Sequence, residues 1–347
     1  MKHYLIALIT LVIFVSCKKE HNNISQETAT TFTIAFGSCN NQDIENKLWT
    51  EIEKHNPQVW IWGGDIIYGD TEDMAIMEEK YRKLKRNQAY KTFSTPRTIL
   101  GTWDDHDYGV NDGGLEFPKK AESQQLFLDF LDVSTESERR TREGVYHSEE
   151  FIADNKRIKI YVLDTRYFRT ELTKNPDINN PDKPYRRYVP NTHDDGTILG
   201  EKQWVWLEDE ISQSEADFNI FVSSIQFLSA EHGWETWGNM PNEVEKLENL
   251  LVQYNLKNAI ILSGDRHISD FSSKEIKGLN YPLIDFTSSG MTHSSRNNLG
   301  EPNIYRFGNL VNQKSFGVLK FNFSDNSVLM EMYGEGNKLQ QSHLQNY

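Results

Sequence analysis

The amino-acid sequence predicts an α/β fold built around a largely parallel sheet. Short apolar, β-prone segments alternate along the chain with segments of helical spacing, as in a sheet that is covered by helices. Residues 58–63 form a continuous apolar run, which is typical of a parallel strand buried on both faces. With 347 residues, of which 37% are hydrophobic, the chain can form one large domain or two modest ones around a sizeable core.

The individual elements follow from local composition. Strands are expected at residues 31–37, 58–63, 97–102, 157–163, 217–223, 258–262, 283–286 and 316–323. Helices are expected at residues 41–55, 74–86, 121–131, 201–211 and 242–254. Residues 316–333 contain Ser-Asp-Asn in their middle and predict an antiparallel hairpin. Residues 173–196 are rich in Pro, Asn and Asp and lack periodicity, so we expect a long insertion loop near a site rather than a domain boundary.

The net charge excludes one class of function. Lys and Arg number 37 against 51 Asp and Glu, which gives a formal charge of −14. A protein that grips nucleic acid needs a basic surplus to neutralise phosphates, so no stable nucleic-acid binding is expected. The composition also excludes a disordered, collagen-like or polytopic membrane chain. The acidic excess fits both a well-solvated surface and carboxylates that hold cations.

The first thirty residues predict export. Residues 4–15 are apolar apart from Thr10, a run too short to span a membrane, which takes about 20 residues. Ser16 and Cys17 follow it and resemble a bacterial lipoprotein signal, in which residues 1–16 are removed and Cys17 is lipidated; an ordinary signal with an incidental cysteine is the alternative. Residues 17–30 are expected to form a flexible tether. The expected location is therefore periplasmic or cell-surface, with membrane attachment only through the lipid anchor.

Polar residues gather directly after the predicted strands. Five clusters lie there: Gly37-Ser38-Cys39-Asn40, Gly64-Asp65-Ile66-Ile67-Tyr68, Trp103-Asp104-Asp105-His106-Asp107, Asp164-Thr165-Arg166 and Gly264-Asp265-Arg266-His267. Because ligands of open α/β sheets bind at the carboxyl ends of the strands, we expect these clusters to converge. Any one of them alone could be a helix cap or a turn. Together, such acidic groups would repel one another unless cations neutralise them, which favours a metal centre.

The predicted metal centre combines several ligand types. Its candidate ligands are Cys39, Asp65, Tyr68, Asp105, Asp265 and His267. A phenol ionises only near pH ~10, so Tyr68 would coordinate a strongly acidic cation such as Fe³⁺. Carboxylates suit Ca²⁺, Mg²⁺ or Mn²⁺, and the two oxygens of Asp65 suit it to bridging. Two metals about 3.5–4 Å apart would clamp the attacking and leaving oxygens of a displacement at phosphorus.

Neighbouring residues are candidates for acid catalysis and phosphate binding. His106 suits a general acid that protonates the leaving alkoxide, with Asp107 as a candidate to orient its ring; on spacing alone, His106 could equally be a metal ligand. The forked guanidinium groups of Arg166 and Arg169 suit phosphate oxygens. Ion pairing within the protein is the alternative for both arginines.

Taken together, these motifs resemble the calcineurin-like metallophosphoesterase superfamily. The residues that carry the resemblance are Gly64-Asp65-x-x-Tyr68, Trp103-Asp104-Asp105-His106-Asp107 and Gly264-Asp265-x-His267. Two features are similar to one subgroup, the PhoD-like alkaline phosphatase/phosphodiesterase family. Asp stands where the superfamily has Asn and His, and the chain contains the motifs Phe36-Gly37-Ser38-Cys39 and Asp164-Thr165-Arg166-x-x-Arg169. The resemblance runs from residue 33 to the C-terminal hairpin.

The resemblance implies a four-layer α/β/β/α metallophosphoesterase sandwich, as a single domain over residues 31–347. It implies hydrolysis of phosphate monoesters or diesters by a metal-activated hydroxide, with His106 as general acid and Arg166 as a second catalytic residue. Fe³⁺ would be held by Cys39, Asp65, Tyr68 and Asp265, and Ca²⁺ by Asp65, Asp105 and His267. The substrate-binding residues would be Arg166, Arg169, His232 and His293, although a structural hydrogen bond is the alternative for His293.

The sequence departs from the family pattern in two places. The catalytic part starts almost directly after the tether, without the N-terminal β-domain of larger members, and Asp107 stands where the family usually has Glu. Two other functions remain open. One is a non-catalytic surface lipoprotein that binds a polyanion or a glycan. The other is a glycoside hydrolase that uses Asp105 and Asp265, which would need neither Cys39 nor Tyr68.

Overall fold

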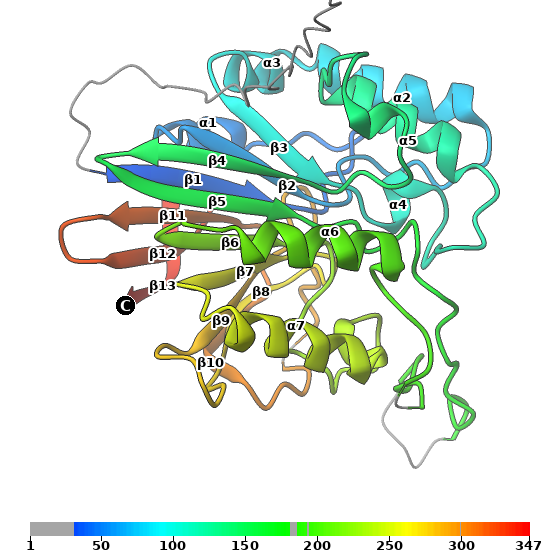
Figure 1. Ribbon diagram of the computed structural model, residues 1–347. Coiled ribbons are helices and arrows are strands. Elements are labelled where there is room, and N and C mark those ends of the chain that lie inside the picture. Colours follow the sequence, from blue (N-terminus) through cyan, green and yellow to red (C-terminus); the bar gives the residue numbers. More distant parts are fainter. Residues whose placement is uncertain (1–30, 181–185, 193, 299) are drawn as a thin grey trace, which may run out of the picture.

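Two mixed β-sheets pack face to face and carry helices on their outer sides (Figure 1). The computed structural model describes residues 31–180, 186–192, 194–298 and 300–347, so the signal and tether predicted for residues 1–30 lie outside the described residues. The predicted four-layer α/β/β/α arrangement is confirmed. The prediction of largely parallel pairing is wrong, because both sheets are mixed, and strand–helix alternation does not reveal the antiparallel strands at their edges.

The first sheet has six strands in the order β13-β12-β11-β1-β2-β3. Their bounds are β1 Thr31–Gly37, β2 Val59–Gly63, β3 Thr98–Thr102, β11 Phe316–Asn322, β12 Ser327–Gly334 and β13 Lys338–Asn346. Strands β1, β2 and β3 are parallel, so their carboxyl ends meet at one edge. The predicted C-terminal hairpin forms from β11 and β12 and joins β1 in antiparallel pairing.

The second sheet has seven strands in the order β10-β8-β9-β7-β6-β5-β4. Their bounds are β4 His147–Ala153, β5 Lys156–Val162, β6 Phe218–Val222, β7 Ala259–Ser263, β8 Ser269–Lys274, β9 Leu283–Ser288 and β10 Arg306–Val311. The central strands β5, β6, β7 and β9 are parallel, and the outer pairings are antiparallel.

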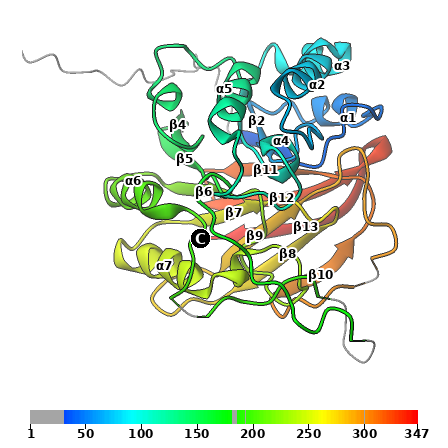
Figure 2. The same ribbon diagram turned by 90° about the vertical axis from the view of Figure 1, so that its right-hand side faces the viewer.

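Helices cover the outer face of each sheet (Figure 2). Their bounds are α1 Trp49–Glu53, α2 Met74–Arg86, α3 Gln88–Ser94, α4 Asp105–Tyr108, α5 Lys120–Phe130, α6 Gly200–Ser212 and α7 Pro241–Gln253. Residues of α1, α2, α3 and α5 pack on the first sheet, and residues of α6 and α7 on the second. Helix α2 begins at the Asp73 N-cap, whose carboxylate accepts hydrogen bonds from the backbone N–H groups of Ala75 and Ile76.

The hydrophobic core has three parts because strand side chains alternate between the two faces of a sheet. Ile34 and Phe36 of β1 point into the core between the sheets, whereas Ala35 faces the helices. Trp60 and Trp62 of β2 likewise face outward, where both rings pack edge-on against Trp49 of α1. Two anchored faces fix the strands of the first sheet, and with them the loops at their carboxyl ends.

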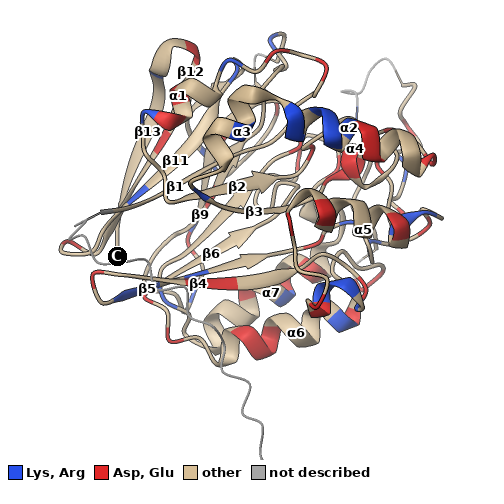
Figure 3. Ribbon diagram, turned by 90° about the horizontal axis from the view of Figure 1, so that it is seen from above, with Lys and Arg blue, Asp and Glu red and all other residues tan. Residues whose placement is uncertain are grey.

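Charged residues of both signs are interspersed along α2, α5 and α6 (Figure 3). Among the described residues, no helix is both long and apolar enough to cross a membrane. The described residues between 173 and 196 form no helix and no strand of either sheet. One isolated bridge joins Lys174 and Tyr188.

Candidate metal centre at the strand ends

The candidate ligands lie in loops that leave neighbouring strands at one edge of the two sheets. Cys39 follows β1, Asp65 follows β2, Asp105 opens α4 after β3, and Asp265 follows β7. Two glycines allow these loops to approach closely. A Cβ on Gly64 would lie 2.5 Å from the Cβ of Asp104, and a Cβ on Gly264 would lie 2.5 Å from the carbonyl oxygen of Gly63.

Four of the candidate ligands have left-handed backbone conformations. The φ angles are 59° at Cys39, 51° at Asp65, 66° at Asp265 and 55° at His267. Such angles cost energy for residues other than glycine and persist where the surroundings over-determine them, typically at functional sites. The strand-end loops therefore hold these side chains in place at a cost to stability.

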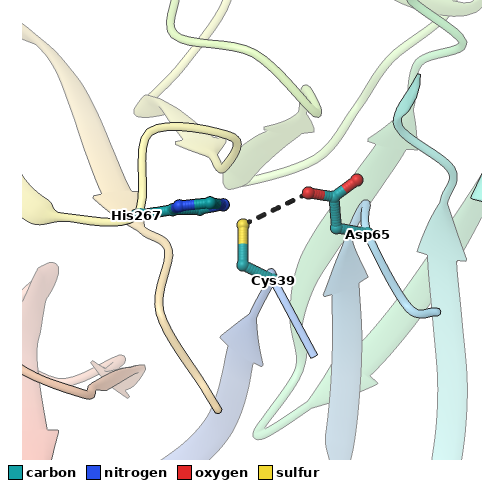
Figure 4. A group of neighbouring side chains, drawn as sticks. All are labelled: Cys39, Asp65 and His267. Carbon is teal, nitrogen blue, oxygen red and sulfur yellow. Dashed lines mark hydrogen bonds between the residues drawn. The ribbon is translucent and has the colours of Figure 1, made fainter. Parts of the chain in front are cut away.

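The Asp65 carboxylate contacts two other candidate ligands, and Figure 4 shows its contact with Cys39 beside His267. Its Oδ2 atom lies 3.4 Å from the Cys39 Sγ and 3.2 Å from the Tyr68 hydroxyl oxygen. The Tyr68 hydroxyl also lies 3.1 Å from the Nε2 atom of His267. Thiol, carboxylate, phenol and imidazole thus meet around one point, although their loops are up to 228 residues apart in the chain.

Three overlapping groups of side chains have ligand atoms within 4.8 Å of one another. They are Cys39–Asp65–His267, Asp65–Asp105–His106 and Asp104–Asp105–Asp265. Asp65 belongs to the first two groups and Asp105 to the last two, so these carboxylates are placed to serve more than one ion. Asp104 is a candidate ligand that the sequence does not predict, because its position beside Asp105 does not distinguish it from a turn residue.

Without a cation, the cluster is electrostatically unfavourable. Burial raises the pKa of Asp65 well above its usual value, and the negative charge of Asp105 adds to this shift. Burial also raises the pKa values of Cys39 and Asp265 well above normal, and that of Asp104 to about 7. Asp105 differs: its burial is outweighed by Arg166, His106 and two backbone N–H donors, and its pKa is lowered. A bound cation would stabilise the ionised form of every one of these groups.

Two orphaned atoms support a fit to metal ions. Oδ1 of Asp65 and Oδ2 of Asp104 are buried and have no hydrogen-bond partner among the described residues. A buried carboxylate oxygen without a partner is costly, and coordination to a cation removes that cost. The donor set of carboxylates, thiol, phenol and imidazole suits both a hard divalent ion and a trivalent one.

His106 lies at the open side of the cluster. Its Nδ1 atom lies 2.6 Å from Oδ1 of Asp70, and its ring stacks on that of Tyr68 at 4.2 Å. Burial would lower the pKa of His106, but the Asp70 hydrogen bond and the charges of Asp65 and Asp105 raise it to about 11. The prediction that Asp107 orients the ring is wrong. Both Asp107 oxygens instead accept backbone N–H groups, among them that of Asp65 at 3.2 Å.

Arg166 and Arg169 lie in a buried ionic network. Arg166 is fully buried and binds Asp104 through Nε at 2.7 Å and Glu235 through Nη1 at 2.5 Å. Arg169 binds the same Glu235 through Nε at 2.7 Å. A guanidinium with no accessible surface has no face to offer to phosphate, so this geometry fits the ion-pair alternative. Both arginines hold Glu235, and Arg166 also holds the candidate ligand Asp104.

The two further histidines differ in position. His293 joins the cluster directly, with Nε2 3.0 Å from the Tyr68 hydroxyl and its ring packed edge-on against His267. His232 is buried, and its Nδ1 accepts the backbone N–H of Trp234 at 3.1 Å. Burial and the charges of Arg266 and Arg306 hold the pKa of His232 well below 6.5.

The long insertion reaches the centre through Asp112. Tyr188 donates a hydrogen bond of 2.6 Å to the Asp112 carboxylate, and Arg187 pairs with the same oxygen at 3.1 Å. The backbone N–H of Asp112 in turn donates to Oδ2 of Asp105 at 2.7 Å. The sequence offers no signal for Asp70, Asp112 or Glu235, since each acts through a contact between distant segments.

A two-sheet sandwich with carboxylates, a thiol and a phenol at its strand ends is a metallophosphoesterase-like architecture. The PhoD-like phosphatase family model matches residues 34–288, and the chain belongs to that family. Alkaline phosphatase D of Bacillus subtilis (strain 168) is 26% identical over 316 residues, which cover 74% of this chain and 51% of the relative. The chain therefore spans about half the length of the curated relative it matches.

Solved structures show the same fold. The structure of PhoD aligns with a TM-score of 0.67 at 17% identity and covers 92% of this chain and 69% of that one. GAP50, the anchor in the inner membrane complex of Plasmodium, has a TM-score of 0.57 at 12% identity, with 91% and 89% covered. A dimetal phosphatase from Danio rerio has a TM-score of 0.52 at 13% identity, with 91% and 99% covered.

Proposed function

We propose that this protein is a metal-dependent phosphoesterase that hydrolyses phosphate monoesters, diesters or both. The observation that carries the proposal is the position of Asp65, whose carboxylate lies between Cys39 and Tyr68 and is shared by two candidate metal groups. Membership of the PhoD-like phosphatase family supports phosphoester chemistry.

The donor types suggest how two kinds of ion would be held. Fe³⁺ suits the side of the cluster with the thiol and the phenol, that is Cys39 and Tyr68. His267 lies with Cys39 and Asp65 and so moves from the Ca²⁺ side to this side, whereas Asp265 lies with Asp104 and Asp105 and moves the other way. Ca²⁺ or another hard divalent ion suits Asp104 and Asp105, with Asp65 shared between the ions. Bound metals would supply Lewis-acid polarisation of the phosphoryl group and a nucleophile at neutral pH.

The protein's own groups would bind, orient and protonate. His106 has one ring nitrogen occupied by Asp70, which leaves Nε2 free to donate a proton to the leaving oxygen. His293 lines the same side of the centre through its contact with Tyr68 and is a candidate to contact the phosphoester. Arg166 and Arg169 act as positioning residues, because they fix Asp104 and Glu235.

A non-catalytic role is the competing proposal, because GAP50, the anchor in the inner membrane complex of Plasmodium, has the same fold. Elemental analysis of the purified protein, combined with a panel of phosphomonoesters and phosphodiesters, separates the two. We expect iron and a divalent metal in the protein, visible absorbance from iron–phenolate or iron–thiolate bonding, and turnover that chelators abolish. Metal-free, colourless protein without turnover would refute the phosphoesterase.

Export as a lipoprotein is a separate proposal that rests on the apolar run before Cys17. Lipidation at Cys17 would hold the enzyme at a membrane surface through acyl chains alone. The test is detergent-phase partitioning of the full chain beside its Cys17→Ser variant. Loss of detergent partitioning in the variant supports the anchor, and equal partitioning contradicts it.

A further inference from the structure

We propose that a cation-lined cavity beside the metal centre binds a second anionic group of the substrate, so that the preferred substrates are phosphoesters whose organic part carries another phosphate or carboxylate. This inference rests on the phosphoesterase function proposed above. The cavity has a volume of about 540 Å³, and Arg296, Lys314 and Lys338 contribute its positive charge.

The loop after β9 links the cavity to the centre. Arg296 lies three residues beyond His293, and the backbone N–H of Ser295, between them, donates to the carbonyl oxygen of His267 at 2.8 Å. On the other side, the backbone N–H of Ser315 donates to Gly290 at 3.2 Å and brings the neighbouring Lys314 to the same loop. Lys314 is close enough for its charge, with burial and His106, to lower the pKa of His293.

The charge of this cavity runs against that of the molecule. The whole chain carries −14, yet three cations face a single carboxylate here, that of Glu335, which lies 3.2 Å from the Nζ of Lys314. Arg296 and Lys338 are exposed, and within the described part of the chain neither forms an ion pair. Two uncommitted cations in one concave surface are complementary to an anion.

The remaining lining selects the kind of anion. Asn312, Gln313 and Gln340 complete the cavity, so every lining side chain is polar or charged. An apolar ligand gains nothing from such a surface, whereas an oxyanion finds amide and guanidinium donors. Because the loop that carries Arg296 also carries His293 and is hydrogen-bonded to His267 through Ser295, we expect an anion in the cavity and a phosphoryl group at the metals to belong to one substrate molecule.

Matched substrates test this inference with the metal-loaded full-length protein. The pair is butyl phosphate and 1,4-butanediol bisphosphate, and the methyl diesters of both serve if diesters are preferred. We expect kcat/KM to be about tenfold higher for the compound with the second phosphate, mainly through KM, and this preference to shrink as salt screens the exposed cations. Arg296→Gln and Lys338→Gln should each remove most of the preference and leave turnover of butyl phosphate unchanged.

The control is Lys202→Gln, which removes an exposed cation on α6, away from the cavity. A binding measurement with non-hydrolysable butane-1,4-bisphosphonate and butylphosphonate gives the same comparison without turnover. Equal affinities in the wild type, or a preference that survives both cavity variants, overturns the inference while turnover of simple phosphoesters leaves the proposed function standing. Absence of turnover with every substrate refutes the proposed function itself, and the inference with it.

Discussion

His106 and Asp70 form a hydrogen bond of 2.6 Å between Nδ1 and Oδ1 at the open side of the candidate metal centre. The two loops are also joined by their backbones, since the N–H groups of Gly69 and Asp70 donate to the carbonyl oxygen of His106 at 2.8 and 3.3 Å. Asp70 has a left-handed φ of 47°, so the loop is held in an unfavourable conformation that aims its carboxylate at the ring. The pair fixes which ring nitrogen faces the centre.

His106→Ala should slow hydrolysis of alkyl phosphates by about 10²–10⁴-fold, because a poor leaving group needs protonation. The 4-nitrophenyl ester has a good leaving group that needs little protonation, so its hydrolysis should slow far less. Asp70→Ala should shift the leaving-group dependence in the same direction. Both effects are measured as kcat/KM across leaving groups of graded pKa, beside elemental analysis. Asp43→Ala, an exposed carboxylate that pairs with Lys83, is the control. Loss of metal in His106→Ala would make His106 a ligand instead.

Tyr68→Phe should remove the visible absorbance of the iron-loaded protein or shift it strongly, because the phenol oxygen is the atom that meets Asp65 and His267. The divalent metal should remain, since the carboxylates that suit it are untouched. Tyr188→Phe is a matched control, because that hydroxyl binds Asp112 rather than a member of the three groups. An unchanged spectrum in Tyr68→Phe would exclude phenolate coordination.

Asp65→Asn should lower the content of both metals together, because the Asp65 carboxylate belongs to two of the three ligand groups. Neutralising a ligand at one side only, as in Asp265→Asn, should affect the two metals unequally. The measurement is the metal-to-protein ratio after dialysis against a weak chelator. Independent loss of one metal in Asp65→Asn would contradict a shared carboxylate.

Much of this architecture is predictable from local sequence. Residues 74–86 fold as the helix that their spacing predicts, and residues 31–37 as the strand, because each buries one regular set of side chains. The helix expected over residues 41–55 is confined to α1. Before α1, side-chain amides compete with helix formation: Asn46 accepts a hydrogen bond from the backbone N–H of Leu48 and donates one to Asn40. The edge strand β13 lacks hydrophobic alternation because residues on both of its faces are largely exposed, so the sequence does not predict it.

Residue types at strand ends are readable from sequence, but their partners are not. Cys39, Asp65 and Asp265 follow apolar strands, and the rule for open α/β sheets places them together. Whether Arg166 binds phosphate or protein carboxylates depends on Glu235, which reaches it from a loop 69 residues later. That choice is made by tertiary packing, which local patterns do not encode.

Arg166→Met should destabilise the fold by about 3–5 kcal/mol, since it leaves buried Asp104 and Glu235 without their shared partner. Arg157→Gln breaks a more exposed pair with Glu150 and should cost no more than about 1 kcal/mol. Urea unfolding of both variants measures the difference. A cost for Arg166→Met as small as that of Arg157→Gln would show that the network contributes little to stability.

His147 on the edge strand β4 should make stability fall at acid pH. The ring is 7% exposed and its Nδ1 lies 3.2 Å from the carbonyl oxygen of Val145. Burial, together with the charges of Arg139 and Arg142, holds the pKa of His147 well below 6.5. Above pH 6.5 the ring is neutral in both the folded and the unfolded chain, so it contributes no pH dependence there.

As the pH falls below 6.5, His147 becomes protonated in the unfolded chain but stays neutral in the folded chain. The free energy of unfolding therefore declines. The decline due to this one residue approaches about 1.4 kcal/mol per pH unit. His147→Asn keeps a donor for Val145 and removes the titration. Unfolding free energies of the wild type and the variant should therefore run parallel from pH 7 to 9 and converge or cross below pH 6.5. Curves that remain parallel down to pH 5 would contradict a buried neutral His147.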